Sequence, residues 1–491
     1  MTVPSALYRP SLALLTDFYE LTMSYAAWKS GAAARHASFS LFFRHHPFRG
    51  GFTVAAGLAQ AIDLVEQLRF SPDDLAWLGT QAGADGAPLF EPAFLDALAG
   101  LAVDLDVDAV PEGTVVFPQE PVLRVEGPVI PALLLESALL AVINFQTLIA
   151  TKAARVALAA RGAPVLEFGL RRAQGIDGAL SASRAAYLGG CAATSNTLAG
   201  RLYGIPVRGT HAHAWVMLHD DEREAFMAYA RALPGNCVFL VDTYATLEGV
   251  RLAIEAGRWL RSIGRELVGI RLDSGDLAWL SIEARRLLDE AGFERAAVMA
   301  SNELDEQIIQ SLNDQGARVA TWGVGTRLVT GADDGALGGV YKLGAVRDGP
   351  AGPWRPKLKV SESAAKTTVP GRLQVRRYRG PDGFLADAIH DLDLGLPAAP
   401  VIVDPLDVTR RRELPPGAAW EDLLVPIFRG GRRVYQPPPL EESRARVQAQ
   451  LAGFHAGVKR FVNPHQFPVG LERGLSDLRV ELTLQARRAP R

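Results

Sequence analysis

Residues 268–277 read Val-Gly-Ile-Arg-Leu-Asp-Ser-Gly-Asp-Leu, and this stretch decides the fold class. An apolar run ends at Leu272, a polar turn follows, and a helical pattern begins at Leu277. A run of this length bounded by a turn is typical of a buried strand. A strand that leads directly into a helix predicts a βα unit with a parallel sheet.

The same alternation extends to both sides of this stretch. Short apolar runs lie at residues 165–168, 207–209, 238–241, 268–272, 297–300, 319–322 and 340–343, and helical patterns such as 185–202, 244–263 and 277–291 separate most of them. Such a series predicts a closed or nearly closed α/β barrel. We therefore expect an N-terminal α+β domain over 1–130, a barrel with the active site over 131–345, and a C-terminal α+β extension over 346–491 that packs on the other two.

Composition narrows the function classes. The chain has 491 residues, 48% hydrophobic and 22% charged, with a formal net charge of −2. This balance is that of a globular protein and favours neither nucleic acid nor an anionic membrane surface. The apolar residues 129–143 are too few for a membrane span and predict a buried helix. Cys191 and Cys237 form no disulfide framework and exclude a cysteine-based zinc site, which favours a cytoplasmic location.

Polar, charged or small residues follow six of the predicted strands. In α/β barrels the active site lies at the carboxyl ends of the strands, so these residues should meet there. They are Gly169, Arg171 and Arg172; Thr210 and His213; Asp242, Thr243 and Tyr244; Asp273, Ser274, Gly275 and Asp276; Ser301, Asn302 and Glu303; and Gly323, Gly325, Thr326 and Arg327.

Each motif also has a structural interpretation. Asp273 is expected to be functional, with a carboxylate suited to Mg²⁺, whereas Asp276 is expected to cap the following helix. The Gly323-Val-Gly325-Thr326 turn suits a phosphate but is equally consistent with a plain turn. Arg171 and Arg172 suit a carboxylate or phosphate, or a surface ion pair.

Two histidines lie close together at His211 and His213. At this spacing an extended segment places both on one face, so a metal pair is conceivable, but no third ligand stands at short spacing. A core strand with one satisfied histidine is the alternative.

Several motifs, in one order along the chain, carry a family resemblance. They are Leu15-Thr-Asp-Phe-Tyr-Glu-Leu-Thr-Met23, Glu167-Phe-Gly-Leu-Arg-Arg-Ala-Gln-Gly175, Gly209-Thr-His-Ala-His213, Arg271-Leu-Asp-Ser-Gly-Asp-Leu277, Gly323-Val-Gly-Thr326, Gly339-Val-Tyr-Lys-Leu343, Lys366-Thr-Thr-Val-Pro-Gly371 and Val462-Asn-Pro-His465. Over nearly its whole length the chain resembles the nicotinate phosphoribosyltransferases.

The resemblance implies a type II phosphoribosyltransferase-like irregular barrel and a reaction. These enzymes join nicotinate to phosphoribosyl pyrophosphate in NAD biosynthesis and couple the transfer to ATP through a phosphohistidine. The resemblance assigns His213 as that histidine, with Tyr19, Arg171 and Thr210 around nicotinate. It also implies Mg²⁺ and a homodimer with shared active sites. It places the phosphoribosyl group near Asp273, Ser274, Gly275, Gly323, Gly325, Thr326 and Thr368.

The chemistry agrees with these assignments. A flat ring with one carboxylate requires an aromatic face, from Tyr19 or Phe168, and one arginine fork, from Arg171. Two alternatives remain: a nicotinamide phosphoribosyltransferase, and a catalytically silent barrel that binds a pyridine nucleotide. A Schiff-base aldolase would need a lysine at a strand end, and Lys342 is the only candidate in these runs.

Overall fold

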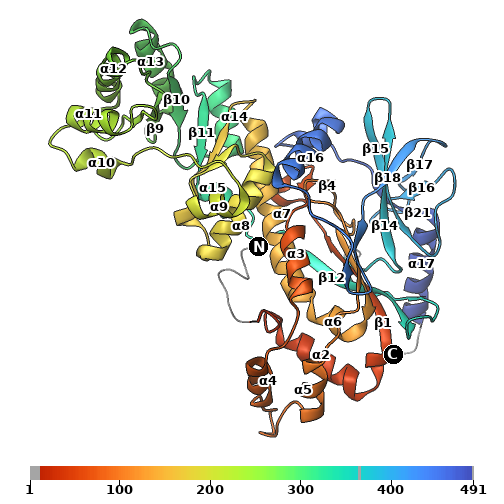
Figure 1. Ribbon diagram of the computed structural model, residues 1–491. Helices are drawn as coiled ribbons and strands as arrows, with labels where there is room; N and C mark the ends of the chain where they lie inside the picture. Colours follow the sequence, from red (N-terminus) through yellow and green to blue (C-terminus); the bar gives the residue numbers. More distant parts are fainter. Residues whose placement is uncertain (1–10, 363–365, 489–491) are drawn as a thin grey trace. The chain divides into compact units, whose positions relative to one another are not determined.

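The computed structural model describes residues 11–362 and 366–488, which form two compact units (Figure 1). Among the described residues, one unit comprises those up to Leu148 together with those from Ala336 onward, and the other comprises Ile149–Gly335. The N-terminal and C-terminal parts, expected as separate domains, thus belong to one unit. Helix α7 (Glu136–Ala159) begins in the first unit and ends in the second.

A sheet built from both ends of the chain holds the first unit together. Its order is β13-β12-β1-β5-β3-β19-β20, and every neighbouring pair is antiparallel. The strands are β1 (Arg35–Phe43), β3 (Asp106–Ala109), β5 (Leu123–Pro128), β12 (Gly339–Asp348), β13 (Arg355–Pro356), β19 (Val425–Arg429) and β20 (Arg432–Arg433).

Strand β12 corrects one expectation, because residues 340–343 were predicted to be the last strand of the barrel. They pair with β1 instead, in a register that runs from Arg35 opposite Asp348 to Phe43 opposite Gly339. Antiparallel pairing along the whole of β1 satisfies far more backbone groups than a short barrel strand would. Sequence periodicity cannot distinguish these two sheets.

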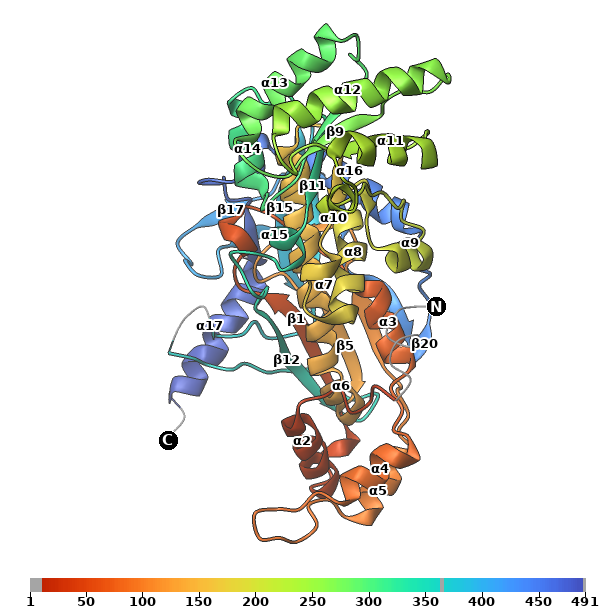
Figure 2. The ribbon, with the colours of Figure 1, turned by 90° about the vertical axis from the view of Figure 1, so that its left-hand side faces the viewer.

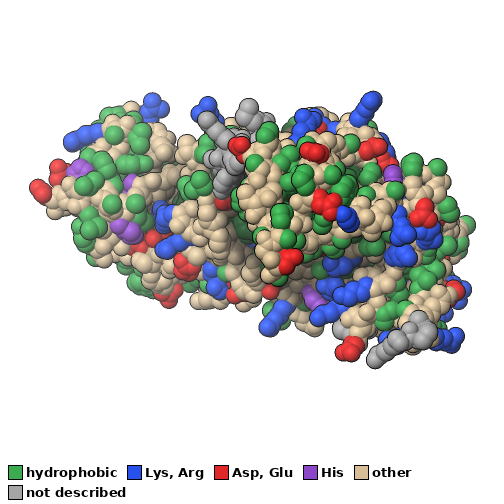
Figure 3. All heavy atoms as spheres, turned by 90° about the horizontal axis from the view of Figure 1, so that it is seen from below, with side chains coloured by type: hydrophobic (Ala, Val, Ile, Leu, Met, Phe, Trp, Pro, Cys, Tyr) green, Lys and Arg blue, Asp and Glu red, His purple; other side chains and the backbone are tan. Residues whose placement is uncertain are grey.

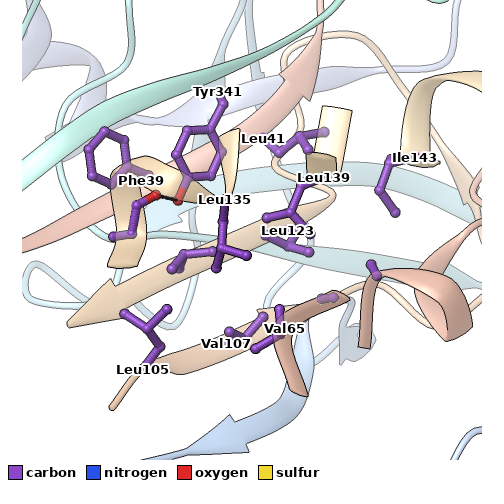
Figure 4. Packing of buried hydrophobic residues seen from close by; sticks show 14 of the residues in the cluster. Phe39, Leu41, Val65, Leu105, Val107, Leu123, Leu135, Leu139, Ile143 and Tyr341 are labelled. Atoms are coloured by element: carbon purple, nitrogen blue, oxygen red, sulfur yellow. Dashed lines mark hydrogen bonds between the residues drawn. The ribbon is translucent and has the colours of Figure 1, made fainter. Parts of the chain in front are cut away.

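The core of this unit lies between the sheet and the start of α7. Figure 4 shows Leu139 beside Leu41 of β1 and Leu123 of β5, and all three are buried. Phe39 and Tyr341 stack with ring centroids 4.8 Å apart, and the Tyr341 hydroxyl donates to the Ala132 carbonyl over 2.9 Å. Full burial of each large aliphatic side chain contributes roughly 1.5–3 kcal/mol, so this layer stabilises the unit.

The apolar stretch Val129–Ala159 is long enough to cross a membrane by length and composition, and 56% of its most apolar window is buried inside the fold. It consists of α6 (Val129–Leu134) and α7. The buried helix expected at residues 129–143 is therefore confirmed, and it extends further than its apolar core.

The rest of the first unit surrounds this layer. Its helices are α2 (Phe18–Lys29), α3 (Leu58–Glu66), α4 (Pro72–Gly79), α5 (Pro92–Ala99), α16 (Leu440–Gly453) and α17 (Arg473–Arg488). A second sheet, in the order β17-β16-β21-β15-β14-β18, comprises β14 (Leu373–Gly380), β15 (Gly383–Asp391), β16 (Val401–Val403), β17 (Arg411–Glu413), β18 (Ala419–Asp422) and β21 (Val469–Glu472). A separate two-stranded sheet of β2 (Thr53–Val54) and β4 (Val115–Val116) also belongs to the first unit.

The second unit contains the predicted parallel sheet. Its order is β7-β6-β11-β10-β9-β8, and all pairs are parallel. The strands are β6 (Val165–Glu167), β7 (Ala193–Thr194), β8 (Val238–Leu240), β9 (Gly269–Leu272), β10 (Ala297–Ala300) and β11 (Thr321–Val324).

Helices connect and cover these strands. They are α8 (Gly175–Gly189), α9 (Thr197–Tyr203), α10 (His213–Met217), α11 (Glu222–Ala232), α12 (Thr246–Ser262), α13 (Leu277–Glu290), α14 (Glu306–Asp314) and α15 (Thr326–Val329). Both views show α12 and α13 beside β9 (Figure 1, Figure 2).

The segment around Val207 closes the sheet without forming a full strand. On one side Val207 makes an isolated parallel bridge to Thr194, and the Arg208 amide donates to the Thr194 carbonyl over 3.0 Å. On the other side the Leu240 amide donates to Nε2 of His211 over 3.2 Å. An imidazole thus takes the place of a backbone acceptor between β7 and β8. The predicted irregular barrel is confirmed.

Figure 3 shows acidic and basic side chains interspersed on one face of the molecule.

Candidate active site

A cavity of about 320 Å³ lies at the carboxyl ends of the parallel strands. The predicted site residues in its wall are Phe168, Arg171, Thr210, Asp273, Gly323, Gly325 and Thr326. The wall also contains Arg172, Ser195, Gly209, His211, Ala212, Arg271, Ser301, Asn302 and Glu303. Residues from strand ends more than 150 positions apart therefore meet in one place.

Arg271 connects the side chains of the cavity wall. Its guanidinium donates to Ser301 Oγ over 2.7 Å, to Thr210 Oγ1 over 3.1 Å and to Asp273 Oδ1 over 2.9 Å. It also lies 5.6 Å from the ring centroid of Phe168. Sequence reasoning did not assign Arg271 a role, although an arginine inside an apolar strand run was a usable signal, since a buried charge needs partners.

Asp273 is fixed by these donors. Burial opposes ionisation of its carboxyl group, but donation from Ser301 and Arg271 outweighs burial and lowers the pKa. Both donors reach Oδ1, while Oδ2 lies 3.8 Å from Nε2 of His213. Asp273 is therefore ionised at neutral pH, with one oxygen committed to the wall and one free of hydrogen bonds to it.

A second aspartate holds the turn that carries Asp273. Oδ2 of the buried Asp242 accepts from the Asp273 amide over 2.8 Å and from the Ser274 hydroxyl over 2.7 Å. Gly275 has φ +79°, which favours glycine. Asp276 accepts from the Trp279 amide over 3.1 Å, so its predicted capping role is confirmed. Ser274 and Gly275 lie in this turn and outside the cavity wall.

The two histidines have different environments. His211 is buried, packs edge-on to Tyr229 at 5.0 Å, and burial lowers its pKa to about 4. It is neutral and structural. His213 begins α10, is half-exposed, and shares a hydrogen bond of 3.1 Å between its Nδ1 and Thr243 Oγ1. Nε2 of His213 therefore faces Asp273 at the edge of the cavity.

The histidine pair does not form a metal site. Across residues 11–362 and 366–488, no group of three His, Cys, Asp or Glu side chains is arranged to hold a metal ion. His211 also uses Nε2 to accept from the Leu240 amide. The structural alternative is thus right for His211.

The glycines of the cavity have a packing role. A Cβ on Gly323 would lie 2.8 Å from the Phe168 ring, and one on Gly325 would lie 3.1 Å from the Phe168 carbonyl. Glu167 holds the neighbouring loop, because its carboxylate accepts from the Gly169 amide and from Ser183 over 2.8 Å. The close approach of β11 to β6 thus positions the Phe168 ring.

Two arginines supply positive charge to the cavity. Arg171 and Arg172 lie in a 3₁₀ turn directly after β6, and both are exposed. In the described part of the chain, neither has a carboxylate at ion-pair distance, so the predicted alternative of a surface ion pair does not apply. A cationic cavity with an aromatic wall and hydroxyl groups suits a flat anion or a phosphate.

Tyr19 and Thr368 belong to the other compact unit and are absent from the cavity wall. Burial, together with the nearby Glu136 and Glu20, raises the pKa of Tyr19 to about 12, so its hydroxyl is a donor at neutral pH. Thr368 accepts from the Lys359 amide over 3.0 Å.

Lys342, the lysine considered for a Schiff base, lies on β12 of the first unit, 3.5 Å from Glu136. It is not at a barrel strand end, so the aldolase alternative is wrong.

Solved structures with the same architecture define the class. A human nicotinic acid phosphoribosyltransferase superposes with a TM-score of 0.82 at 32% identity and covers 95% of this chain and 99% of its own. A nicotinate-nucleotide pyrophosphorylase from Pyrococcus furiosus has a TM-score of 0.68 at 23% identity, covers 90% and 96%, and shows the fold alone. The chain is an α/β-barrel enzyme with the type II phosphoribosyltransferase fold.

Sequence relatives identify the family. The chain is 41% identical to a nicotinate phosphoribosyltransferase of Bacillus subtilis over 470 residues, 94% of this chain and 93% of the relative. It is 35% identical to the human nicotinate phosphoribosyltransferase over an alignment 530 positions long, gaps included, which covers 95% of each chain. Models of the nicotinate phosphoribosyltransferase N-terminal and C-terminal domains match residues 14–144 and 374–479. The chain belongs to the nicotinate phosphoribosyltransferase family.

Proposed function

We propose that this enzyme transfers the phosphoribosyl group of phosphoribosyl pyrophosphate to nicotinate, giving nicotinate mononucleotide and pyrophosphate in NAD salvage, with coupling to ATP. The observation that carries the proposal is the arrangement of two unpaired arginines and the ionised Asp273 around one cavity. Family membership supports the substrate pair, and the cavity supplies a separate reason for preferring nicotinate over its amide.

Nicotinate binding follows from the side chains after β6. The substrate carboxylate pairs with Arg171, and its ring lies on Phe168. Thr210 accepts from Arg271 over 3.1 Å and donates to the His211 carbonyl over 3.0 Å, so its hydroxyl is fixed in the cavity wall. Nicotinamide has no negative charge to compensate Arg171, which makes it the weaker substrate.

Charge development at the ribose explains the other half of the cavity. As pyrophosphate leaves, C1 becomes cation-like, and the ionised Asp273 stabilises that charge. The leaving group requires donors and small residues on the opposite side. We assign this role to Gly323, Gly325 and Thr326 of the cavity wall and, on the family resemblance alone, to Ser274, Gly275 and Thr368.

The donor set also suits a magnesium ion. Mg²⁺ is usually held by one or two carboxylates together with substrate phosphates, and Oδ2 of Asp273 is a hard oxygen without a hydrogen-bond donor. Bound there with the pyrophosphate, Mg²⁺ would neutralise negative charge on the leaving group.

We assign His213 as the phosphoryl acceptor for ATP. In the tautomer whose Nδ1–H donates to Thr243 Oγ1, Nε2 carries the lone pair that the reaction requires. Nε2 forms a bond to the γ-phosphorus while the bond to the ADP oxygen breaks, and later hydrolysis releases phosphate. The phosphorylated ring brings about two negative charges toward Asp273, 3.8 Å away. The resulting repulsion links the state of His213 to the position of Asp273.

The protein is further proposed to act as a cytoplasmic homodimer in which a second copy supplies Tyr19. Leu15, which precedes α2, and Phe18, Tyr19 and Met23 on α2 all expose apolar surface. Because the cavity wall comes entirely from the second unit, Tyr19 can complete it from another chain.

Product formation tests the proposed reaction. Purified protein with phosphoribosyl pyrophosphate and Mg²⁺ should convert nicotinate at least roughly a hundredfold more efficiently than nicotinamide, given the worth of a charged pair in a desolvated site. ATP should raise the yield at equilibrium. Equal efficiency for the two substrates would favour the nicotinamide enzyme, and absence of turnover with both would favour the silent barrel.

A further inference from the structure

A second cationic cavity lies in the first unit, and its wall contains none of the residues of the proposed reaction. Its volume is about 470 Å³. The wall is formed by Arg410, His455, Arg460, Asn463, Pro464, His465 and Gln466 and contains no carboxylate. The sequence resemblance covers part of this wall, in Val462-Asn-Pro-His465, without assigning it a role.

Backbone hydrogen bonds with Gly457 fix the ring of His455 and the main chain of His465. The Gly457 amide donates to Nδ1 of His455 over 3.1 Å, so the proton of the neutral ring resides on Nε2. The His465 amide donates to the Gly457 carbonyl over 2.9 Å. The two ring centroids are 6.1 Å apart. A Cβ on Gly457 would lie 3.0 Å from both histidines, so they close around a position that only glycine fits without displacement.

The positive charge of the cavity is largely uncompensated. Within residues 11–362 and 366–488, no carboxylate lies at ion-pair distance from Arg460, His455 or His465. Arg410 has one carboxylate at ion-pair distance among the described residues, Asp404 at 3.7 Å, and a weaker electrostatic interaction with Asp407. Lys459, next to Arg460, is different, because its ammonium group donates to the Leu451 carbonyl over 2.7 Å. The residues of the wall thus keep their donors free, whereas their neighbour does not.

The backbone around the arginines is also fixed. The Arg410 amide donates to Asp407, and the Arg410 carbonyl accepts from Asp404, each over 3.0 Å. Asn463 has φ +47°, a left-handed conformation that turns the chain between Arg460 and His465. Two arginines and two histidines therefore line the cavity from two ordered turns.

We propose that this cavity binds a di- or polyphosphate anion, separately from the active site. Guanidinium groups bind phosphate oxygens in pairs, and imidazole N–H groups add single donors. The cavity is large for one phosphate group, and four separated donors match oxygens distributed over two or more. Free pyrophosphate and the phosphate chain of a nucleotide share this chemistry.

Histidine signals of the full-length protein in NMR spectra report on this site directly. His455→Gln and His465→Gln assign the two imidazole signals. Titration with pyrophosphate near pH 7 should shift both in a saturable way, with an affinity roughly tenfold or more above that for sulfate. Repeating the titration with ATP distinguishes the sources. Tighter binding of ATP identifies a nucleotide site, and equal binding shows that the phosphates alone are recognised.

Charge variants distinguish a specific phosphate site from non-specific electrostatic attraction. Arg410→Gln combined with Arg460→Gln should weaken pyrophosphate binding by roughly tenfold or more, because both forks are lost. Arg412→Gln removes an exposed arginine of the neighbouring strand β17 and should change it by less than about twofold. Absence of a saturable shift, or equal weakening by Arg412→Gln, overturns the proposal. Unchanged thermal unfolding of the double variant confirms that a loss of binding is local.

Discussion

At the scale of single residues, the two histidines of the Gly-Thr-His-Ala-His motif predict opposite mutational effects. His213→Ala removes a half-exposed ring whose nitrogen faces Asp273, so ATP-stimulated product formation should disappear while slow ATP-independent transfer remains. Thermal unfolding should shift little, because a half-exposed side chain contributes little to the core. Activity assays with and without ATP, together with a test for acid-labile phosphate on the protein, check both points.

His211 provides the contrasting variant. His211→Ala leaves the Leu240 amide without its acceptor and opens space among aromatic rings, so it should destabilise the protein by about 2–4 kcal/mol. Denaturant unfolding measures this loss.

If His213→Ala retains ATP-stimulated turnover, the phosphoryl acceptor is not His213.

A buried carboxyl group behind the active site predicts a pH effect on stability. Burial, followed by repulsion from Asp242 and Glu248, raises the pKa of Glu222 to about 7. The unfolded chain ionises this group near its ordinary value while the folded protein retains the proton. Stability therefore falls as pH rises from about 4.5 to about 7 and stays low above that range.

Glu222→Gln removes this titration. The variant should match the wild type near pH 4.5 and exceed it above pH 7 by roughly 3 kcal/mol at most, which corresponds to the size of the pKa shift. Unfolding by urea across this pH range provides the measurement. Because Glu248 contributes part of this repulsion, Glu248→Gln should narrow the pH range over which stability falls without abolishing the titration. A parallel offset at every pH would show that the effect is packing and not ionisation.

At the scale of elements, the sequence predicted the central parallel strands of the barrel better than the strands at which the barrel ends or closes. Runs such as 238–241 and 268–272 are apolar and flanked by helices, so local pattern was sufficient. It failed at residues 340–343 because those residues pair with β1, some 300 positions earlier. The local pattern also failed at Val207, where a full strand was predicted. There the imidazole of His211 accepts a hydrogen bond that a backbone carbonyl was expected to accept.

The site was predictable to the same extent and for the same reason. Strand ends are visible in the sequence, so Arg171, Thr210 and Asp273 were predicted to meet, and they do line one cavity. The contacts of Arg271 with Ser301, and of Asp242 with the turn after β9, depend on distances between strands. No local pattern contains those distances.

The approach of β11 to β6 yields a prediction about an element. Gly323→Ala places a Cβ 2.8 Å from the Phe168 ring, so it should destabilise the protein by about 1–3 kcal/mol and raise the KM for nicotinate. Gly335→Ala is the matched control, because nothing lies within 4 Å of its added Cβ. Steady-state kinetics and thermal unfolding of both variants test this. Equal KM values would show that Phe168 does not contact the substrate.

At the scale of the whole molecule, the proposed dimer divides one active site between two chains. Tyr19 and Arg171 belong to different compact units, and the cavity wall contains only Arg171. Tyr19→Ala and Arg171→Ala should each be nearly inactive, since each removes a nicotinate contact from every site. In a shared site, however, the two substitutions affect residues that come from different chains.

Mixing the two variants therefore discriminates between shared and self-contained sites. After subunit exchange, half of the dimers combine one chain of each kind, and one of their two sites receives an intact Tyr19 and an intact Arg171. Roughly a quarter of the wild-type activity should return for a symmetric dimer. Recovery should follow the rate of subunit exchange and vanish on dilution below the dimer dissociation constant. No recovery, with heterodimers verified by mass spectrometry, would mean that Tyr19 acts within its own chain or not at the site.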